Sequence, residues 1–187
     1  MNNKDKIILD LCGGTGAWSR PYKDNGYDVH NITTPEYDVN NYYPPINVYG
    51  ILAAPPCTMF SIARTKAKSP RSFETGMILV IACLDIIWKC QYKNKLKFWC
   101  LENPKGYLRQ FLGIPAFKFF AYEFSHPWSK PTDLWGYFKI PNKYKLSLKN
   151  MTYNNYTTNI GGSNARKKIN RSITPSGFAN AFFKANR

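Results

Sequence analysis

The sequence is poor in the residues that build metal centres and disulfide frameworks. Its 187 residues include five cysteines and two histidines, and no two cysteines form a Cys-x-x-Cys pair. Zinc sites and disulfide frameworks both use such residues in closely spaced sets, so this composition argues against either. We therefore expect no metal centre, and a reducing, cytoplasmic compartment.

Long hydrophobic runs are also missing. No apolar stretch reaches the roughly 18 residues that a membrane span needs, and residues 1–6 show no secretory signal pattern. We expect neither a membrane partner nor secretion. The chain contains no internal repeat and no long linker, and its length suits one domain over residues 1–187.

Acidic residues are scarce beside basic ones. The chain has 26 Lys and Arg against 11 Asp and Glu, a formal net charge of +15. An excess of this size favours an anionic partner, and nucleic acid is the leading candidate. A basic surface that serves only solubility is the alternative.

Apolar patterns predict strands that alternate with helices. We expect strands at residues 6–11, 27–32, 48–53 and 98–101, shorter extended segments at 36–42, 121–124 and 132–138, and helices at 18–25, 74–91 and 175–184. This alternation favours a mainly parallel α/β sheet with helices on both faces. Helical spacing in the segment 74–91 predicts core side chains that include Ile81 and Trp88. Residues 58–73 are expected to form a mobile loop.

The first motif with candidate chemistry is a glycine-rich turn after the first strand. Asp10 stands near the end of that strand, and Gly13, Gly14 and Gly16 follow it. A buried strand that runs through such a turn into a helix lets a ligand approach the backbone and the free N–H groups of the helix. A tight turn without a ligand is the alternative.

The second motif is the Pro-Pro-Cys sequence at residues 55–57. Two prolines fix the backbone after a strand, so the thiol of Cys57 is displayed on a stiff loop, as a nucleophile would be. The alternative is a small buried side chain, which is what most free cysteines are.

The third motif places Glu102 and Asn103 at the end of an apolar strand. Parallel sheets carry their sites at this carboxyl edge. A desolvated glutamate there can hold a proton near neutral pH and donate it to a ring nitrogen. A solvated glutamate in an Asn-Pro turn is the alternative.

Together and in this order, the three motifs resemble those of the cytosine-C5 DNA methyltransferases, and most closely the short versions of phages and other viruses. The resemblance implies a class I, Rossmann-like fold, S-adenosylmethionine as cofactor with S-adenosylhomocysteine as product, and DNA as partner. It makes Cys57 the nucleophile that adds to C6 of a flipped cytosine. It makes Glu102 the residue that contacts N3 and the exocyclic amine, after which C5 accepts the methyl group.

The resemblance also implies binding residues. As cofactor contacts it indicates Asp10, Gly13, Gly14, Gly16, Trp18, Asp38, Pro55 and Asn180. As nucleic-acid contacts it indicates Ser61, Arg64, Lys66, Lys130 and Thr132. A turn aspartate remains the alternative for Asp38, and a core aromatic for Trp18.

The chain departs from the family pattern in three places. The second strand lacks a terminal acid for the ribose, and Glu36 is the nearest substitute. Lys130 and Thr132 stand where the family has an Arg-x-Arg segment. The target-recognition region is reduced to a short basic segment at residues 140–172, so we expect a short or relaxed recognition sequence, or a second subunit that supplies recognition.

Two other functions stay open. One is a catalytically idle DNA-binding relative, a decoy or regulator, although a pure binder needs neither Cys57 nor Glu102. The other is a methyltransferase that acts on RNA or on free cytosine nucleotides, although a charge of +15 exceeds what a mononucleotide requires.

Overall fold

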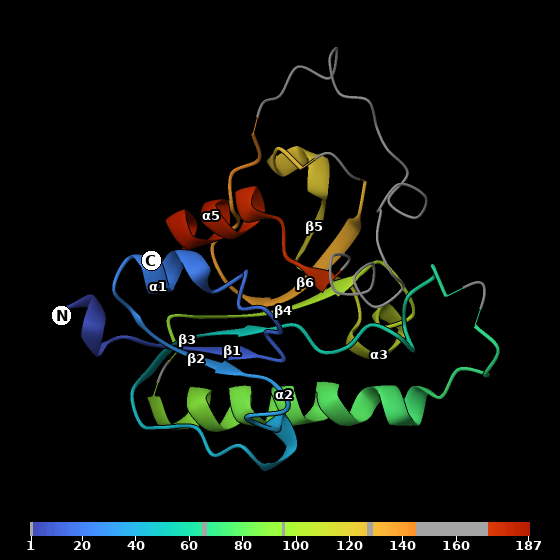
Figure 1. Ribbon diagram of the computed structural model, residues 1–187, viewed down its shortest axis with the longest axis horizontal. Coiled ribbons are helices and arrows are strands. Elements are labelled where there is room, and N and C mark those ends of the chain that lie inside the picture. The colour runs from blue at the N-terminus through green and yellow to red at the C-terminus, as the bar shows by residue number, and fades with distance from the viewer. Residues whose placement is uncertain (1, 65–66, 95, 127–128, 145–171) are drawn as a thin grey trace.

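The computed structural model describes residues 2–64, 67–94, 96–126, 129–144 and 172–187 (Figure 1). Six strands form one sheet in the order β2-β1-β3-β4-β6-β5. They are β1 (Ile7–Leu11), β2 (Asp28–Ile32), β3 (Val48–Ala53), β4 (Phe98–Pro104), β5 (Phe117–Phe120) and β6 (Pro131–Tyr137). The α-helices described are α1 (Arg20–Asp24), α2 (Phe73–Asn94), α3 (Arg109–Leu112) and α5 (Ser176–Ala185).

The sheet is mixed but mostly parallel. β2, β1, β3 and β4 run parallel, and β6 lies antiparallel between β4 and β5. The carboxyl ends of the four parallel strands therefore meet at one edge. Within this sheet Ala53 of β3 pairs with Leu101 of β4, so the segment that follows β3 begins beside the last three residues of β4.

Helices cover both faces of the sheet, as the expected α/β class requires. α2 crosses one face, while α1 and α5 lie together on the other (Figure 1). Alternation along the strands sends side chains to the two faces in turn. Toward α2 point Leu9, Leu11, Ile51 and Leu101; toward α1 and α5 point Ile8, Leu52, Phe98 and Cys100. This class is compatible with a Rossmann-like fold.

Two expected extended segments are short 3-10 helices. Residues 36–42 contain η2 (Val39–Asn41), because the Asp38 carboxylate accepts the amide of Asn40 and turns the chain. Residues 121–124 form η3 (Ala121–Phe124). The Glu123 carboxylate caps this helix, because it accepts the amide of Phe120 at 2.7 Å. The strand lies just before it, as β5.

Two other boundaries differ in ways that concern function. Helix α1 starts at Arg20, later than expected, and residues 14–19 form turns instead of its first residues. The glycine turn therefore does not run directly into a helix. β4 extends through Glu102 and Asn103 to Pro104, because β6 pairs with it from Trp99 to Pro104.

Two of the residues predicted to lie in the core of α2 are on the surface. Ile81 is 58% exposed and Trp88 is 67% exposed, whereas Val80 and Cys83 are fully buried. The helix carries apolar side chains around most of its circumference, so its sequence does not single out the stripe that faces the sheet. Among the residues described, no helix has the length and apolar composition that a membrane crossing requires.

An ion pair to a buried carboxylate joins α3 to the sheet. Arg109 donates from Nε and Nη2 to the two carboxylate oxygens of Asp133, both at 2.6 Å, and the Asp133 side chain is 1% exposed. We expect Arg109→Leu to destabilise the protein by about 3 kcal/mol, because it leaves a buried carboxylate without its cation. Urea unfolding measures this.

The control is Arg20→Leu. Arg20 pairs with Asp24 at 2.8 Å, but both side chains are largely exposed. Its loss should change the free energy of unfolding by less than about 0.5 kcal/mol. Equal effects of the two substitutions would contradict the assignment of the Arg109 pair as the stabilising one.

Candidate active site

A buried hydrogen bond joins the second and third sequence motifs. The Asn103 side-chain amide donates from Nδ2 to the carbonyl of Pro55 at 2.9 Å. Asn103 is fully buried in β4, and Pro55 begins the loop that follows β3. The loop that carries Cys57 is therefore fastened to the strand that carries Glu102.

The loop after Cys57 is folded onto the segment after β4. The Cys57 carbonyl accepts the amides of Phe60 at 2.9 Å and Ser61 at 2.8 Å, which makes a tight turn. The Phe60 carbonyl in turn accepts the Tyr107 amide at 2.9 Å. Gly106 faces this carbonyl so closely that a Cβ there would overlap it. Cys57 itself is half-buried, so its thiol is not sealed inside the core.

Arg71 is a residue of this site that sequence reasoning missed. It donates from Nη1 to the Met59 carbonyl and from Nη2 to the Ser61 carbonyl, both at 2.9 Å. Its guanidinium also lies 4.9 Å from the centre of the Tyr107 ring. The sequence places Arg71 in an expected mobile loop, and nothing local distinguishes it from the nearby Lys68.

We expect Arg71→Ala to lower the rate of any reaction at Cys57 by about 10- to 100-fold, because the turn loses its brace. Arg71→Lys should be nearly as slow, since an ammonium cannot span two carbonyls as a guanidinium does. Single-turnover kinetics measure the effect. A full recovery of the rate in Arg71→Lys would show that Arg71 acts through its charge and not through its two hydrogen bonds to the loop.

Glu102 is paired with Lys130. The Lys130 Nζ lies 3.6 Å from the Glu102 Oε1, and the two side chains are only 13% and 14% exposed. Lys130 precedes β6, the strand that pairs with the Glu102 strand. Burial and the charge of Lys130 lower the pKa of His126, a third titratable group near this pair that the sequence did not single out. Glu102 is therefore mostly shielded from solvent and lies beside a cation.

Asp10 is fully buried at the end of β1. Within the described part of the chain, neither carboxylate oxygen has a hydrogen-bond partner. Burial raises the pKa of Asp10 to about 6, and the neighbouring hydroxyl and amide of Ser19 oppose this only in part. A carboxylate held this way is a strong acceptor for a ligand donor.

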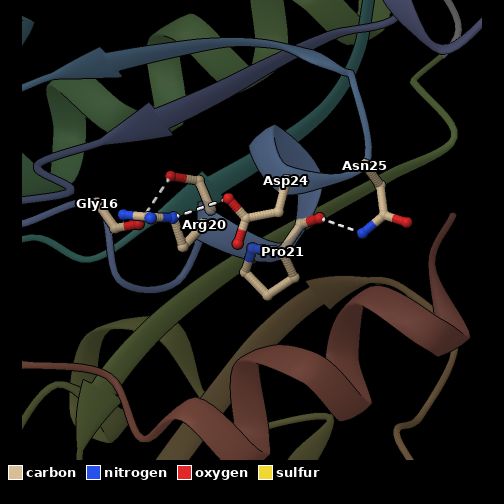
Figure 2. Close-up of polar contacts among 6 residues, drawn as sticks. Gly16, Arg20, Pro21, Asp24 and Asn25 are labelled. Atoms are coloured by element: carbon tan, nitrogen blue, oxygen red, sulfur yellow. Dashed lines mark hydrogen bonds and ion pairs between the residues drawn. The ribbon is translucent and has the colours of Figure 1, made fainter.

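The glycine turn lies directly against Asp10. A Cβ on Gly13 would overlap the carboxyl group of Asp10 and the amide oxygen of Asn31, so only glycine fits there. Gly14 and Gly16 have φ of 55° and 69°, in the left-handed region that glycine favours. The turn is anchored on α1, because the Gly16 carbonyl accepts the Arg20 amide at 2.9 Å. Figure 2 shows Gly16 beside the first residues of this helix.

The polar atoms beside the turn fit the amino acid end of S-adenosylmethionine. Among the residues described, the side-chain oxygen of Asn31 also has no partner, while its Nδ2 donates to the Gly14 carbonyl at 3.0 Å. Asn31 and Asp10 therefore offer free acceptors at one place, as an ammonium group needs. Asn31 was not among the predicted residues, because β2 lacks the expected acid.

Asp10 and Glu102 also face the same side of the sheet. Their strands are separated by β3, so strand spacing alone sets them about 10 Å apart across the sheet. Alternation from Ile8 and Cys100 turns both carboxylates toward the α1 and α5 face. The glycine turn and the Cys57 loop therefore share one edge.

The other predicted cofactor residues are in less direct positions. Trp18 is 2% exposed and packs on Phe178 and Phe182, which is the core placement left open for it. Asp38 uses its carboxylate to cap η2. Asn180 is exposed on α5 and donates to the Ser176 carbonyl at 2.9 Å.

The predicted nucleic-acid residues lie on the loop and beside β6. Ser61 accepts the Ala63 amide at 3.2 Å, and Arg64 donates to the Ser69 hydroxyl at 2.8 Å. Thr132 is buried, and its hydroxyl donates to the Lys130 carbonyl at 3.3 Å. Lys66 lies outside the described residues, as does most of the basic segment at 140–172.

Across the residues that the structure covers, no group of three His, Cys, Asp or Glu side chains is arranged to hold a metal ion. Comparison of the chain with protein-family models and with curated proteins found no match to either.

Proposed function

We propose that this protein is a DNA (cytosine-5-)-methyltransferase. The observation that carries the proposal is the buried hydrogen bond from Asn103 to Pro55. It brings the Cys57 loop against the strand of Glu102, as a reaction at one pyrimidine ring would require.

Cys57 is the nucleophile in this proposal. Its thiolate forms a bond to C6 of the cytosine, and the ring electrons move to C5, which becomes nucleophilic. After C5 has taken up the methyl group, a base removes the C5 proton and the bond between sulfur and C6 breaks. The turn at Phe60 and Ser61 and the brace by Arg71 support this role, because they hold the loop in one conformation.

Glu102 acts on the opposite edge of the ring. A hydrogen bond or proton at N3 spreads the negative charge that develops when sulfur adds. Lys130, 3.6 Å from Glu102, holds the carboxylate in place and adds positive charge to the pocket. In this proposal Lys130 takes the place of the missing Arg-x-Arg segment.

The cofactor supplies an electrophilic methyl group on a sulfonium. Asp10 and Asn31 would hold its amino group, and Gly13 would let the ligand approach the backbone. A cation beside Asp10 also relieves the cost of keeping a carboxylate buried without a partner.

DNA is the proposed substrate because the formal charge is +15. A stacked cytosine is out of reach of Cys57, so the base must leave the duplex or come from a single strand. With little chain available for base readout, we propose a short or relaxed recognition sequence, or recognition by a second subunit.

The deciding experiment is a trapping assay. The protein is incubated with S-adenosylmethionine and a duplex that contains 5-fluorocytosine, whose C5 substituent cannot leave as a proton. We expect a covalent complex that survives denaturation and maps to Cys57. Omission of the cofactor should leave no methylated adduct.

A parallel panel of dCMP, single-stranded DNA, duplex DNA and RNA, each with labelled S-adenosylmethionine, sets the substrate class. Transfer to DNA is expected. Transfer only to RNA or dCMP would move the proposal to that substrate. No transfer to any member, together with no adduct, would favour the idle DNA-binding relative.

Lys130→Met removes the cation beside Glu102 while keeping most of the side-chain volume. We expect kcat for methyl transfer to fall by about 10- to 100-fold with a smaller change in KM, because the charge acts on the transition state. Lys130→Arg should recover most of the rate.

Lys105→Met, an exposed neighbour, is the control. If Lys130 only attracted DNA, both Met variants would instead raise KM and leave kcat unchanged.

A further inference from the structure

Two cysteines that the proposed reaction does not use lie in contact. The Cys12 and Cys83 sulfurs are 4.0 Å apart, although the residues are 71 positions apart in the sequence. Cys12 is the first residue after β1, between Asp10 and the turn glycines. Cys83 lies in the middle of α2 and is fully buried.

The backbone holds Cys12 in an unusual conformation. Its φ is 55°, in the left-handed region where a residue with a Cβ is strained. Its amide donates to the Ile32 carbonyl at 2.8 Å, which fixes the start of the turn. The nearby residues Gly14 and Gly16 also have a positive φ, which glycine adopts without strain. A cysteine at this place therefore carries a cost that glycine would avoid.

The two thiols differ in access and acidity. Cys12 is half-buried, so a small solute reaches it more readily than Cys83. The contact with Cys83 lowers the pKa of Cys12, while that contact and burial raise the pKa of Cys83. Cys12 is thus the thiol that reacts first, and Cys83 is the thiol that can resolve the product.

We propose that Cys12 and Cys83 form a reversible disulfide that ties the glycine turn to α2 and stops cofactor binding. Only the identity of the ligand that is lost rests on the proposed function; the pairing of the two cysteines does not.

The oxidant is a peroxide. The Cys12 thiolate attacks hydrogen peroxide, the O–O bond breaks, and Cys12 becomes a sulfenic acid with release of hydroxide. The Cys83 sulfur then attacks the Cys12 sulfur, the S–O bond breaks, and the thiol proton leaves with the oxygen as water. The two sulfurs together lose two electrons to the peroxide. A dithiol reductant reverses the change by thiol–disulfide exchange.

Bond formation must move the turn. A disulfide brings its sulfurs to about 2 Å, so the 4.0 Å contact has to close by half. Cys83 sits inside a long helix packed on the sheet, whereas Cys12 opens a turn rich in glycine. The displacement therefore falls on the turn, where Gly13 already has no free space beside Asp10 and Asn31.

The test uses Cys57→Ala as the parent, so that peroxide cannot act on the proposed nucleophile. After peroxide treatment and alkylation of the remaining thiols, peptide mapping should find Cys12 linked to Cys83. Calorimetry on the same sample should show affinity for S-adenosylhomocysteine at least about tenfold weaker, restored by dithiothreitol.

The matched control is Cys83→Ala in this parent, which keeps Cys12 and the whole turn; Cys12→Ser is the second variant that cannot form the bridge. Both should keep their affinity through the same treatment. No 12–83 link, or a linked protein that binds as well as the reduced one, overturns the proposal. Equal loss in Cys83→Ala also overturns it, because oxidation of Cys12 alone would then suffice.

The two hypotheses fail separately. A reduced parent that does not bind S-adenosylhomocysteine contradicts the proposed function, and mapping of the link still decides the pairing. A reduced parent that binds, but forms no link, removes the switch and leaves the proposed function standing.

Discussion

Cys57→Ala is expected to reduce methyl transfer to cytosine-containing DNA by more than about 1,000-fold. Cytosine is a poor carbon nucleophile until a bond forms at C6, so removal of the thiol removes the step on which the rest of the reaction depends. Labelled methyl transfer under single-turnover conditions measures the loss. The 5-fluorocytosine adduct should disappear with it.

The fold should survive this substitution. Cys57 is half-buried on a loop, and the loop is held by hydrogen bonds that the carbonyl groups of Cys57 and Pro55 accept. Cys57→Ala should therefore bind S-adenosylhomocysteine and DNA as the parent does. Methyl transfer by a correctly folded Cys57→Ala protein would contradict the covalent mechanism, whatever the affinity of this variant for DNA.

Asp10→Asn is expected to make the protein more stable and to weaken its cofactor binding. Burial raises the pKa of Asp10 from 3.8 to about 6, so ionisation is harder in the folded chain than in the unfolded one. At pH 7 this costs about 3 kcal/mol of stability. Asparagine carries no charge, so most of that cost should vanish.

The effect of Asp10 on folding stability should depend on pH. Between pH 3.8 and about 6 the folded protein binds more protons at Asp10 than the unfolded chain does. This contribution to the stability of the parent therefore falls as pH rises through that window, and the full cost is present above it. The difference in unfolding free energy between Asp10→Asn and parent should grow from near zero at pH 4 to its maximum at about pH 7.

Urea unfolding at several pH values measures this difference in unfolding free energy. Titration calorimetry measures the affinity for S-adenosylhomocysteine. We expect affinity for S-adenosylhomocysteine to fall by about 10- to 100-fold, because a hydrogen bond to a charged acceptor is lost. Asp24→Asn, on the surface of α1, is the control and should be nearly neutral (Figure 2). A difference that did not change with pH would contradict the role of burial.

The sequence alone predicted most strands, and it placed the candidate site residues near their ends. β3 has the predicted bounds, β1 and β2 start one residue later than predicted, and β6 lies one residue earlier at both ends. These predictions rest on local patterns, namely apolar runs, glycine turns and prolines, that act within a few residues. The same locality explains why the ends of β1 and β4 and the segment after β3 were singled out as candidate site elements.

Side chains that choose between equivalent surfaces could not be assigned this way. Ile81 and Trp88 have the spacing of core residues but lie on the exposed side of α2, because only the packed sheet determines which stripe is covered. Residues 36–42 and 121–124 turn because a single carboxylate, from Asp38 or Glu123, bonds to a nearby amide. Such a side-chain bond to the backbone is an alternative to strand hydrogen bonding, and the sequence pattern does not show which of the two structures forms.

By itself, the sequence determined an α/β chain with a strong positive charge and with Asp10, Cys57 and Glu102 near strand ends. Only the tertiary structure decided the partners of those residues and of their neighbours: Asn103 with Pro55, Lys130 with Glu102, and Cys12 with Cys83. The reason is physical. Strand and turn preferences are set by neighbours along the chain, whereas these contacts join residues that become neighbours only when β1, β3, β4 and β6 align in one sheet and α2 packs across it.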